Sequence, residues 1–548
     1  MKQKLWKKRG KQFCALCLGM VFSVTGTIQG ADPSRQTAFA AEKNTGTDKP
    51  SLQKELVLRV GECDTLEVKN LKGQKIRWTV ASGKKVVHLS VVKKKAEISG
   101  LKAGRAKILA KVGKKKLYCK VKVRKVNYGV REEEESESTS DPVSKLPMSE
   151  NSVNLMQQIS SKKVSAKQPS LKFSYATADF SVKMLKKLMK QDKTGKVLIS
   201  PDSILTALAM LEQGASNATL KEMQELRGKG ISQNSYHAYL STLNKSLTAS
   251  KGVTYRVADS IWKRNDSFYQ LSPSFLQKNK SFYDAEIYEA PFDDSTVSDV
   301  NAWCSNHTNG MIPKIIDQFP KSQDAKTAFL LLNAVLFEGA WNEPYEDGQV
   351  KKEKFTTESG KKQTVSMMKE ETNAYIKING GTGFIKEYKN SRFAFVGMLP
   401  KTGQSVDDFI KELTGKDFVI ACKSQRYQRT LTKLPEFSYD YSVSLKQTLQ
   451  SMGMKQAFSE SQADFSHMVG ELNPSVHLFV GDVLHKTHIE VDKNGTKAAA
   501  ATAVMMNETT SIRPVQEPKK VYLDRPFAYA VIDRKTGIPL FLGAVKNI

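Results

Sequence analysis

The chain carries few reactive side chains at the spacings that catalysis or metal binding requires. His485 and His488 lie three residues apart in a strand-like run, where the alternation of side chains would put them on opposite faces. The chain also contains no Gly-x-Ser-x-Gly segment of the kind that exposes a hydrolase nucleophile. We therefore expect no enzyme activity, no metal site and no cofactor.

The six cysteines fall at positions 14, 17, 63, 119, 304 and 422. Only the first two form a Cys-x-x-Cys pair, and they lie in a segment with the pattern of a removable signal, so the sequence does not indicate a zinc site. Cys63 and Cys119 could form a disulfide bond, but sparse single thiols are equally consistent with no pairing.

The most unusual stretch follows Gly495 and begins with a run of small residues. Four consecutive alanines, 498–501, would favour a short helix on propensity alone. However, the alternate positions from Thr496 to Met506 are all small or apolar, whereas Lys497 falls on the opposite face. The segment could therefore also enter a β-sheet.

With this stretch the sequence resembles the serpins, a family of serine protease inhibitors. The resemblance covers about residues 168–548 and rests on motifs that follow one another in the family's order. Towards the C-terminus these are Lys493-Asn494-Gly495 with the Thr and alanine run after it, Asp524-Arg525-Pro526-Phe527 and Pro539-Leu540-Phe541-Leu542-Gly543. Upstream they are Ser200-Pro201-Asp202-Ser203-Ile204, Asn301-Ala302-Trp303, Thr308-Asn309-Gly310, Leu332 to Trp341, Leu434-Pro435-Glu436-Phe437 and Ala463-Asp464-Phe465-Ser466.

The resemblance implies a suicide inhibitor whose exposed reactive loop is cut by its target and then inserts into a central sheet. A target serine protease would form an acyl ester through its own nucleophile, so the chemistry would belong to the protease. A cysteine protease is a second target class. About 14 inserted residues at roughly 3.3 Å each would carry the tethered protease on the order of 45 Å. The alternative is a non-inhibitory serpin-fold binding or structural protein at the bacterial cell surface, which would need a hinge that cannot insert.

The resemblance also assigns residues to the loop and to the sheet beneath it. The family's polar cluster under the opening sheet corresponds to Ser200, Ser203, Asn333 and His485, and the aromatic residue where insertion begins corresponds to Trp341. The loop hinge corresponds to Lys493, Gly495, Thr496, Lys497, Ala498, Ala499, Ala500, Ala501 and Thr502. Lys493 and Lys497 stand where the family commonly has glutamate, so a stabilising contact at the base of the loop is either absent or reversed.

The family's usual spacing from Gly495 places the cleaved bond at Thr509–Thr510. A small β-branched residue at this bond suits an elastase-like or subtilisin-like protease. The loop region is slightly longer than the family's, so a cut at Thr510–Ser511 or after Arg513 is an alternative. Pro514 should hinder trypsin-like cleavage after Arg513.

Helical and strand patterns mix over residues 168–548 without a βαβ order. Apolar residues at helical spacing follow Phe180, and a second apolar helix follows Ser200-Pro201. Long strand patterns occur at Ala328 to Phe337 and Phe393 to Leu399. The patterns predict an α+β domain with mostly antiparallel sheets, and the resemblance implies a serpin fold with three β-sheets, surrounding helices and an exposed loop.

Residues 52–126 read as a separate basic module. They hold 22 basic and 5 acidic residues, whereas 168–548 hold 49 and 41, so more than half of the net charge of +29 lies in this short region. Short alternating runs, with Trp78 available for a core, predict a small antiparallel sandwich. Charge confined to one module gives no case for a nucleic-acid partner. The lysines could contact an anionic cell-wall polymer or a glycan, and a solvated charged face is the alternative.

The order of pieces in this module resembles the bacterial immunoglobulin-like domains of group 2. The matching pieces are Val60-Gly61, Trp78-Thr79, Val86-Val87, Gly100-Leu101-Lys102-Ala103-Gly104 and Lys116-Leu117-Tyr118-Cys119-Lys120-Val121. The resemblance implies a spacer or adhesive module at a cell surface.

The N-terminal residues 1–40 have the pattern of a signal peptide. Basic residues up to Lys11 precede an apolar run from Phe13 to about Val24, and Ala38-Phe39-Ala40 supplies a cleavage signal. An uncleaved anchor is the alternative. Residues 127–167 are acidic and Ser-rich, which predicts a flexible linker. We expect a monomer that is secreted, extracellular or associated with a bacterial cell envelope, and no C-terminal anchor, because Leu540 to Val545 should form a buried strand.

Overall fold

The computed structural model describes residues 49–59, 63–71, 73–92, 94–124, 145–265, 269–318, 329–472, 478–496 and 517–548. The chain divides into Met1–Lys49 and Pro50–Ile548, and the described helices and strands lie in the second unit. The expected signal peptide, residues 1–40, lies outside the described residues. In the part of the chain that is described, no helix is long and apolar enough to cross a membrane.

Residues 55–124 form a two-sheet unit that we call the N-terminal β module. One sheet has the order β1 (Glu55–Arg59), β7 (Lys115–Arg124), β6 (Gly104–Val112) and β3 (Ile76–Ser82), and the other has the order β2 (Cys63–Leu66), β5 (Lys95–Gly100) and β4 (Val87–Val92). Inward side chains of both sheets share one core that includes Trp78 and Cys119. The expected antiparallel sandwich is wrong at one pair of strands. The first and last strands of the module, β1 and β7, pair in parallel.

Cys119 is buried in this core as a free thiol, so it forms no disulfide bond. Burial raises the pKa of this thiol to about 11, which leaves it protonated and unreactive at neutral pH.

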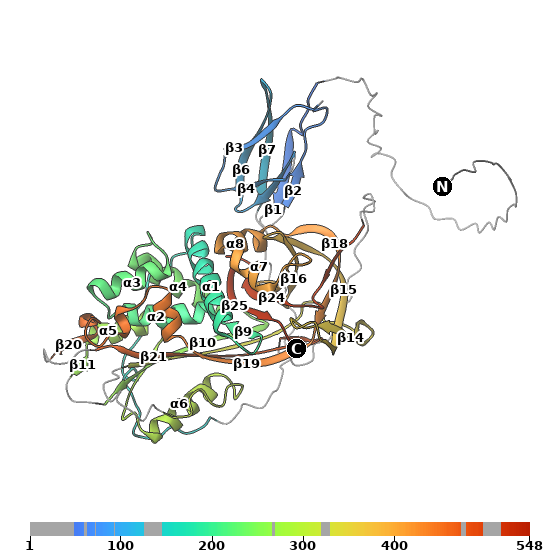
Figure 1. Cartoon of the computed structure of the whole chain (residues 1–548). Helices are drawn as coiled ribbons and strands as arrows, with labels where there is room; N and C mark the ends of the chain where they lie inside the picture. The colour runs from blue at the N-terminus through green and yellow to red at the C-terminus, as the bar shows by residue number, and fades with distance from the viewer. Residues whose placement is uncertain are drawn as a thin grey trace, which may run out of the picture. The chain divides into compact units, whose positions relative to one another are not determined.

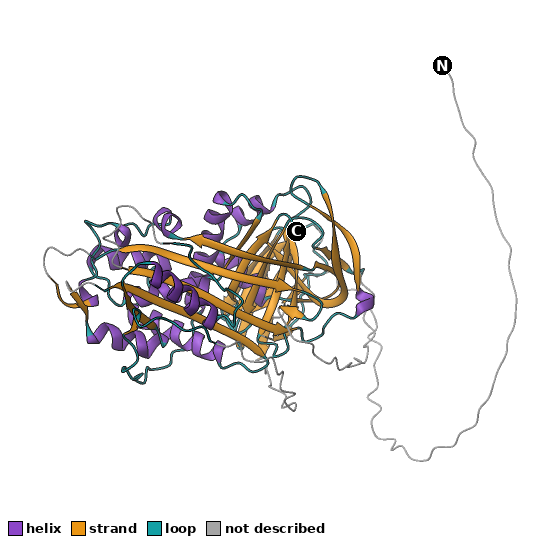
Figure 2. Ribbon diagram, turned by 90° about the horizontal axis from the view of Figure 1, so that it is seen from below, coloured by secondary structure: helices purple, strands orange, loops and turns teal. Residues whose placement is uncertain are grey.

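The start of the loop region lies in a seven-stranded layer that we call the central sheet. Its strands follow the order β19 (Phe437–Ser444), β21 (Val480–Val491), β22 (Gly495–Thr496), β13 (Phe329–Ala340), β10 (Val253–Arg264), β12 (Glu286–Ala290) and β8 (Val153–Asn154). Helix α6 (Asp294–His307) covers one face, while α2 (Pro201–Glu212) and α4 (Gln233–Thr248) lie on the other (Figures 1 and 2). Because both faces are covered, β13 reads as a nearly continuous apolar run and is buried along most of its length.

A second sheet contains nine strands. Its path runs β23 (Lys519–Tyr522), β18 (Arg426–Pro435), β15 (Lys362–Ile378), β16 (Gly381–Glu387), β17 (Phe393–Leu399), β24 (Phe527–Asp533), β25 (Ile538–Val545) and β9 (Lys196–Ile199), and β14 (Val350–Thr356) pairs with β15. The resemblance implied three β-sheets, and outside the N-terminal β module the described strands form this sheet, the central sheet and a short pair. The long strand β15 pairs with β18 along its middle and with β16 at its end. A short pair, β11 (Tyr269–Leu271) and β20 (Val469–Leu472), completes the β structure.

The two helices expected from the sequence are present. Helix α1 (Leu171–Gln191) begins where the Ser170 side chain accepts a hydrogen bond from the amide of Phe173, and it buries the apolar stripe that follows Phe180. Helix α2 begins at Pro201, a residue that suits the first helical turn because its missing N–H needs no partner there. The remaining helices are α3 (Asn217–Arg227), α5 (Pro273–Tyr283), α7 (Val406–Glu412), α8 (Gly415–Lys423) and α9 (Lys446–Ser451).

The part of the predicted linker that the structure describes, residues 145–167, is packed rather than free. Strand β8 adds to the edge of the central sheet by pairing with β12, and Met156 is buried in the main core. The carboxylate of Asp299, on α6, accepts hydrogen bonds from the amide and hydroxyl of Ser149 and from the hydroxyl of Ser152. A segment with few apolar residues is held here by hydrogen bonds, which the composition of the linker does not reveal.

Candidate functional site: an opening in the central sheet

The central sheet holds β13 and β21 together at one end and apart at the other. The two strands pair directly and in parallel from Phe329 to Ala334 on β13 and from Val480 to Lys486 on β21. Beyond this stretch β22 lies between them, with Thr496 opposite Gly339 on one side and opposite Val491 on the other. The start of the predicted hinge is therefore already antiparallel to β13, between the two strands that would have to separate.

Aromatic side chains fix the hinge residue Thr496. The hydroxyls of Thr496 and Tyr388 are hydrogen-bonded at 2.6 Å, and both side chains are buried. Tyr388 stacks on Trp341 at 4.6 Å between ring centroids, and the indole N–H of Trp341 donates to the carbonyl of Asp492 at 2.9 Å. The position assigned to Trp341 is therefore where β22 enters the sheet.

The base of the hinge carries a reversed charge contact. The Lys493 ammonium lies 2.5 Å from the Asp347 carboxylate, and this pairing raises the pKa of Lys493, with smaller contributions from Glu436 and Asp492. The contact at the base of the loop is therefore present, with the positive charge on the loop residue Lys493 and the negative charge on Asp347. Lys497 lies outside the described residues.

The predicted polar cluster assembles where β13 and β21 still touch. Asn333 and His485 are register partners, and the Asn333 carbonyl lies 2.5 Å from His485 Nδ1. On the other ring nitrogen, His485 Nε2 accepts from the backbone amide of Ser200 at 3.1 Å. The Asn333 amide group donates to the hydroxyl of Ser203, so the four residues drawn from three distant parts of the sequence form one network.

Asp259 belongs to the same network, and the sequence analysis missed it. It is the register partner of Asn333 on β10, and its carboxyl accepts a hydrogen bond from the Asn333 amide. A single acidic residue within the apolar strand Val257 to Trp262 was the available signal, because a buried carboxyl needs a polar partner. Tyr388 was also missed, and nothing in its sequence surroundings points to it.

Burial shapes the charges of this cluster. It lowers the pKa of His485 to about 3, so the ring is neutral, as its two hydrogen bonds require. Burial raises the pKa of Asp259 well above its ordinary value and that of the nearby Asp202 to about 7. The His485 ring therefore takes part through neutral hydrogen bonds, which can be exchanged for others more easily than a buried ion pair can.

His485 and His488 point to opposite faces of β21, as the spacing predicted. His485 is fully buried, whereas His488 Nδ1 lies 2.6 Å from the Asp440 carboxylate near the surface. Among the residues that the structure describes, no group of three or more His, Cys, Asp or Glu side chains is placed to hold a metal ion.

Most of the predicted loop lies outside the described residues. This applies to the hinge residues Lys497, Ala498, Ala499, Ala500, Ala501 and Thr502 and to the candidate bond residues Thr509, Thr510, Ser511 and Arg513. The described chain resumes at Glu517 and enters β23, which pairs parallel with β18 in the second sheet. The loop thus connects the opening in the central sheet with the second sheet.

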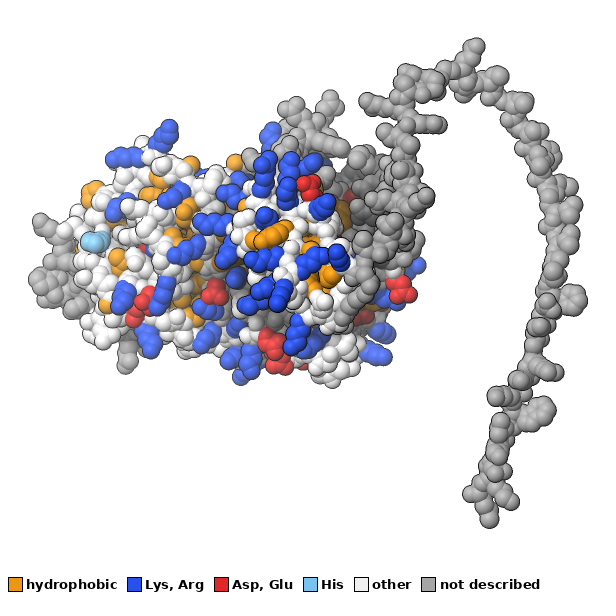
Figure 3. Space-filling view, turned by 90° about the horizontal axis from the view of Figure 1, so that it is seen from above, with side chains coloured by type: hydrophobic (Ala, Val, Ile, Leu, Met, Phe, Trp, Pro, Cys, Tyr) orange, Lys and Arg blue, Asp and Glu red, His pale blue; other side chains and the backbone are white. Residues whose placement is uncertain are grey.

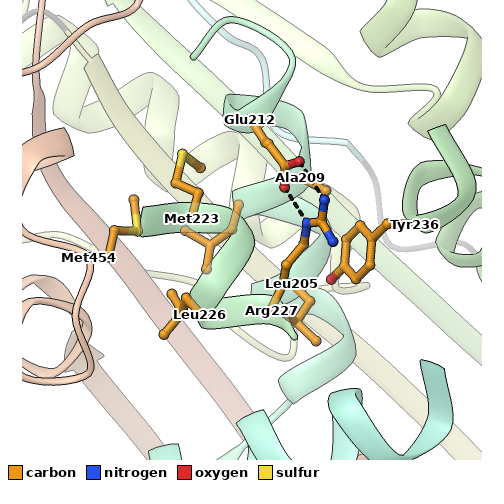
Figure 4. Close-up of a pocket in the computed structure, with 9 residues that line it drawn as sticks. Leu205, Ala209, Glu212, Met223, Leu226, Arg227, Tyr236 and Met454 are labelled. Carbon is orange, nitrogen blue, oxygen red and sulfur yellow. Dashed lines mark hydrogen bonds and ion pairs between the residues drawn. The ribbon is translucent and has the colours of Figure 1, made fainter. Parts of the chain in front are cut away.

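A small pocket lies beside α2 and α3, away from the opening (Figure 4). Leu205, Met223 and Leu226 line it, and its polar wall is the buried ion pair between Glu212 and Arg227, with contacts of 2.7 and 3.0 Å. Because the guanidinium and the carboxylate satisfy each other, this pair joins two helices and leaves no charge for a ligand.

Comparisons with known proteins agree with this geometry. Residues 175–548 match the profile of the family described as "Serpin (serine protease inhibitor)". The chain belongs to the serpin family. Human Serpin B8 is 30% identical over 389 residues, which cover 68% of this chain and 98% of Serpin B8. Iripin-8 of Ixodes ricinus is 28% identical over 392 residues, which cover 70% of this chain and 95% of Iripin-8.

Among solved structures, the native state of the thermophilic serpin tengpin matches with a TM-score of 0.67 and 39% sequence identity. The match covers 73% of this chain and all of the tengpin chain. Serpins are generally protease inhibitors rather than catalysts, so this serpin is assigned to serine protease inhibition in general. The N-terminal β module precedes the matched family region.

Proposed function

We propose that this serpin is a suicide inhibitor of elastase-like or subtilisin-like serine proteases, cut at Thr509–Thr510. Cysteine proteases are a second target class. The observation that carries the proposal is the position of β22, which begins an antiparallel strand between β13 and β21.

The register of β22 predicts which residues the hinge would meet if it inserted into the central sheet. Continued along β13 without a bulge, it brings Thr502 opposite Asn333 and, on the other side, opposite His485. Insertion therefore has to break the hydrogen bond between Asn333 and His485, and the Thr502 hydroxyl is suited to replace it. Ala498 and Ala500 would share the inward face with Thr502, where small side chains can pass under the sheet without a clash.

Insertion would also place opposite charges next to each other. In the same register Lys497 falls opposite Glu338 on the outer side of β13, so the lysine that departs from the family's usual glutamate gains a carboxylate neighbour across the strands. Opposite charges on directly facing strands stabilise a sheet by roughly 0.2–1 kcal/mol. This supports a hinge that is adapted to insertion rather than barred from it.

The test mixes the purified protein with pancreatic elastase, subtilisin and trypsin and analyses the products on denaturing gels. We expect a covalent complex that survives denaturation and a released C-terminal peptide that begins at Thr510 by mass spectrometry. Clean cleavage without a complex for every protease would contradict inhibition and favour a non-inhibitory serpin.

A matched pair of variants tests the direction of the hinge. Ala500→Arg puts a charge on the inward face and should convert the inhibitor into a substrate, because insertion then fails before the acyl ester is hydrolysed. Ala501→Arg puts the same side chain on the outward face and should largely retain complex formation. Equal loss in both variants would contradict the register.

We further infer that the protein is exported, with cleavage after Ala40, and that the N-terminal β module is an immunoglobulin-like unit that displays the inhibitor at a bacterial cell envelope. The basic n-region, the apolar run and the Ala38-Phe39-Ala40 signal support export. Mass spectrometry of the protein recovered from the producing cells should give a mature N-terminus at Ala41. A chain that retains Met1 in the membrane fraction would instead indicate an uncleaved anchor.

A further inference from the structure

The outer face of the larger sheet of the N-terminal β module is crowded with cations. Side chains on β3, β6 and β7 that point away from the core are Arg77, Arg105, Lys107, Lys111, Lys116, Lys120, Lys122 and Arg124, and we call this set the basic face. All eight are exposed. Lys and Arg side chains gather on the surface shown in Figure 3, where acidic side chains are sparse.

Many of these cations face each other directly. The register of β6 and β7 places Arg105 opposite Lys122, Lys107 opposite Lys120 and Lys111 opposite Lys116. Like charges in such positions destabilise a sheet. Three charged rows of this kind, with the Leu109–Tyr118 row between the second and the third, therefore weaken the fold. A partner that supplies negative charge would remove the repulsion.

The protein itself does not supply that charge. Glu55, on the neighbouring strand β1, is the one carboxylate among the described side chains of this face. Glu67 and Glu97 lie on or beside the other sheet of the module, where Glu67 pairs with Lys95. None of these eight cations forms an ion pair with another residue that the structure describes.

The cations are spaced for a linear partner. Alternate residues along a strand lie roughly 6.6 Å apart, and neighbouring strands lie about 4.8 Å apart. Strands β6 and β7 therefore present two adjoining columns of positive charge. A flexible polymer with one negative charge per short repeat could lie along these columns and meet cations on both sides of the uncharged Leu109–Tyr118 row.

The other side chains of the face argue against nucleic acid and against a sugar-reading site. Its exposed aromatic residue is Tyr118, and the Lys107 ammonium lies 4.3 Å from the centre of that ring, which leaves the ring poorly placed to stack on a base. Thr79 and Ser82 are the hydroxyl residues of the neighbouring strand β3 on this face. The strand positions of the face that the structure describes offer no amide side chain to read sugar hydroxyls. The main feature of this face that a ligand could recognise is therefore its positive charge.

We propose that the basic face binds a linear polyol-phosphate polymer, such as the phosphodiester chains of a bacterial cell wall, along β6 and β7. The phosphodiesters would each meet a Lys or Arg, and the polyol links between them require no specific contact. Binding would hold the serpin at a surface, and it does not depend on the inhibitory mechanism.

The test uses the full chain and purified poly(glycerol phosphate) as the probe, with heparin and duplex DNA as competing polyanions. We expect poly(glycerol phosphate) to bind with an affinity that falls steeply with salt, and to bind more tightly than either competitor at equal charge concentration. Tighter binding of heparin would assign the face to a sulfated glycan, and tighter binding of DNA would assign it to nucleic acid. Either result would overturn the proposal.

A charge-matched pair of double variants locates the binding. Lys107→Glu with Lys120→Glu removes one facing pair from the basic face and should weaken binding at least tenfold. Lys84→Glu with Lys85→Glu makes the same change in net charge in the exposed turn between β3 and β4, and should weaken it less than threefold. Equal weakening would mean that net charge alone causes binding, which would contradict the proposed face.

Two further measurements guard against a folding defect. Lys107→Gln with Lys120→Gln removes the charges without adding carboxylates, should keep the melting temperature of the unchanged protein, and should reduce the slope of log affinity against log salt by about 1.5. Complex formation with a target protease should be the same in all these variants. An unchanged salt slope in a well-folded variant would overturn the proposal.

Discussion

At the scale of single residues, His485 holds the closed part of the opening through two neutral hydrogen bonds. Protonation would put a hydrogen on Nε2, where it would face the N–H of Ser200. The pKa of His485 is about 3 in the native state, against an ordinary value of 6.5. Below pH 6.5 the unfolded chain therefore binds a proton that the native state does not, and the contribution of His485 to stability is lost as the pH falls from 6.5 towards 3.

This predicts a difference between the protein and its His485→Gln variant. The free energy of unfolding of the unchanged protein should fall, relative to the variant, by up to about 1.4 kcal/mol per pH unit across that window. Asp202 acts in the opposite sense, because its pKa is raised to about 7, but it is present in both proteins and cancels. Denaturant titrations at several pH values give the difference, and a constant difference from pH 7 to pH 4 would show that His485 is not a buried neutral ring.

The hydrogen bond between the hydroxyls of Thr496 and Tyr388 can be tested by measuring the unfolding free energy of single and double variants. Thr496→Val should cost about 1–3 kcal/mol of unfolding free energy, because it leaves a buried tyrosine hydroxyl without its partner. Combining it with Tyr388→Phe should cost less than the sum of the two single changes. Strict additivity in chemical denaturation would mean that the two hydroxyls do not interact.

At the scale of elements, the segment before α1 acts as an added edge of the central sheet. Asp299 holds it through three hydrogen bonds and is itself buried. Strand β8 and the turn before it thereby connect the edge of the sheet to helix α6, which covers that face.

Asp299→Ala should therefore destabilise the fold by about 2–3 kcal/mol, since hydrogen bonds to a charged acceptor are among the stronger ones. Hydrogen exchange of residues 149–155 should accelerate at the same time. Asp294→Ala, at the exposed start of the same helix, is the control and should cost less than about 1 kcal/mol. If exchange in residues 149–155 is unchanged in Asp299→Ala, this carboxylate does not hold the segment.

At the scale of the whole molecule, the central sheet could accept a further strand between β13 and β21, which pair directly from Phe329 to Ala334. Residues 497–506 would form that strand by displacing this direct pairing and by pairing with β13 on one side and β21 on the other in the register of β22. At about 0.5–1.5 kcal/mol for each net backbone hydrogen bond, the filled sheet would be more stable by on the order of 10 kcal/mol.

Cleavage within the loop should thus raise the melting temperature sharply while both fragments stay associated. Calorimetry before and after limited proteolysis measures this directly. The Ala500→Arg variant should show a smaller rise after cleavage, because its inward arginine opposes insertion. A cleaved protein that melts at the original temperature would show that the loop does not enter the sheet.

The sequence by itself determined the family, the α+β character and most of the residues of the opening. The family was indicated by motifs that follow one another in the family's order. The apolar periodicity that predicted α1, α2 and β13 is a local property, so it can be recognised without knowing the partners of those elements. The alternation of small residues after Gly495 likewise indicated a segment able to enter a sheet.

Only the tertiary structure decided which residues meet. Asp259 joined the polar cluster because β10 lies beside β13 in register, and Tyr388 met Thr496 because the second sheet brings it to the opening. The residues from Lys145 to Lys167 looked like a linker because they cannot form a core alone, yet the edge of the central sheet and Asp299 give them partners. Contacts between distant segments depend on strand order and register, and local composition carries no record of either.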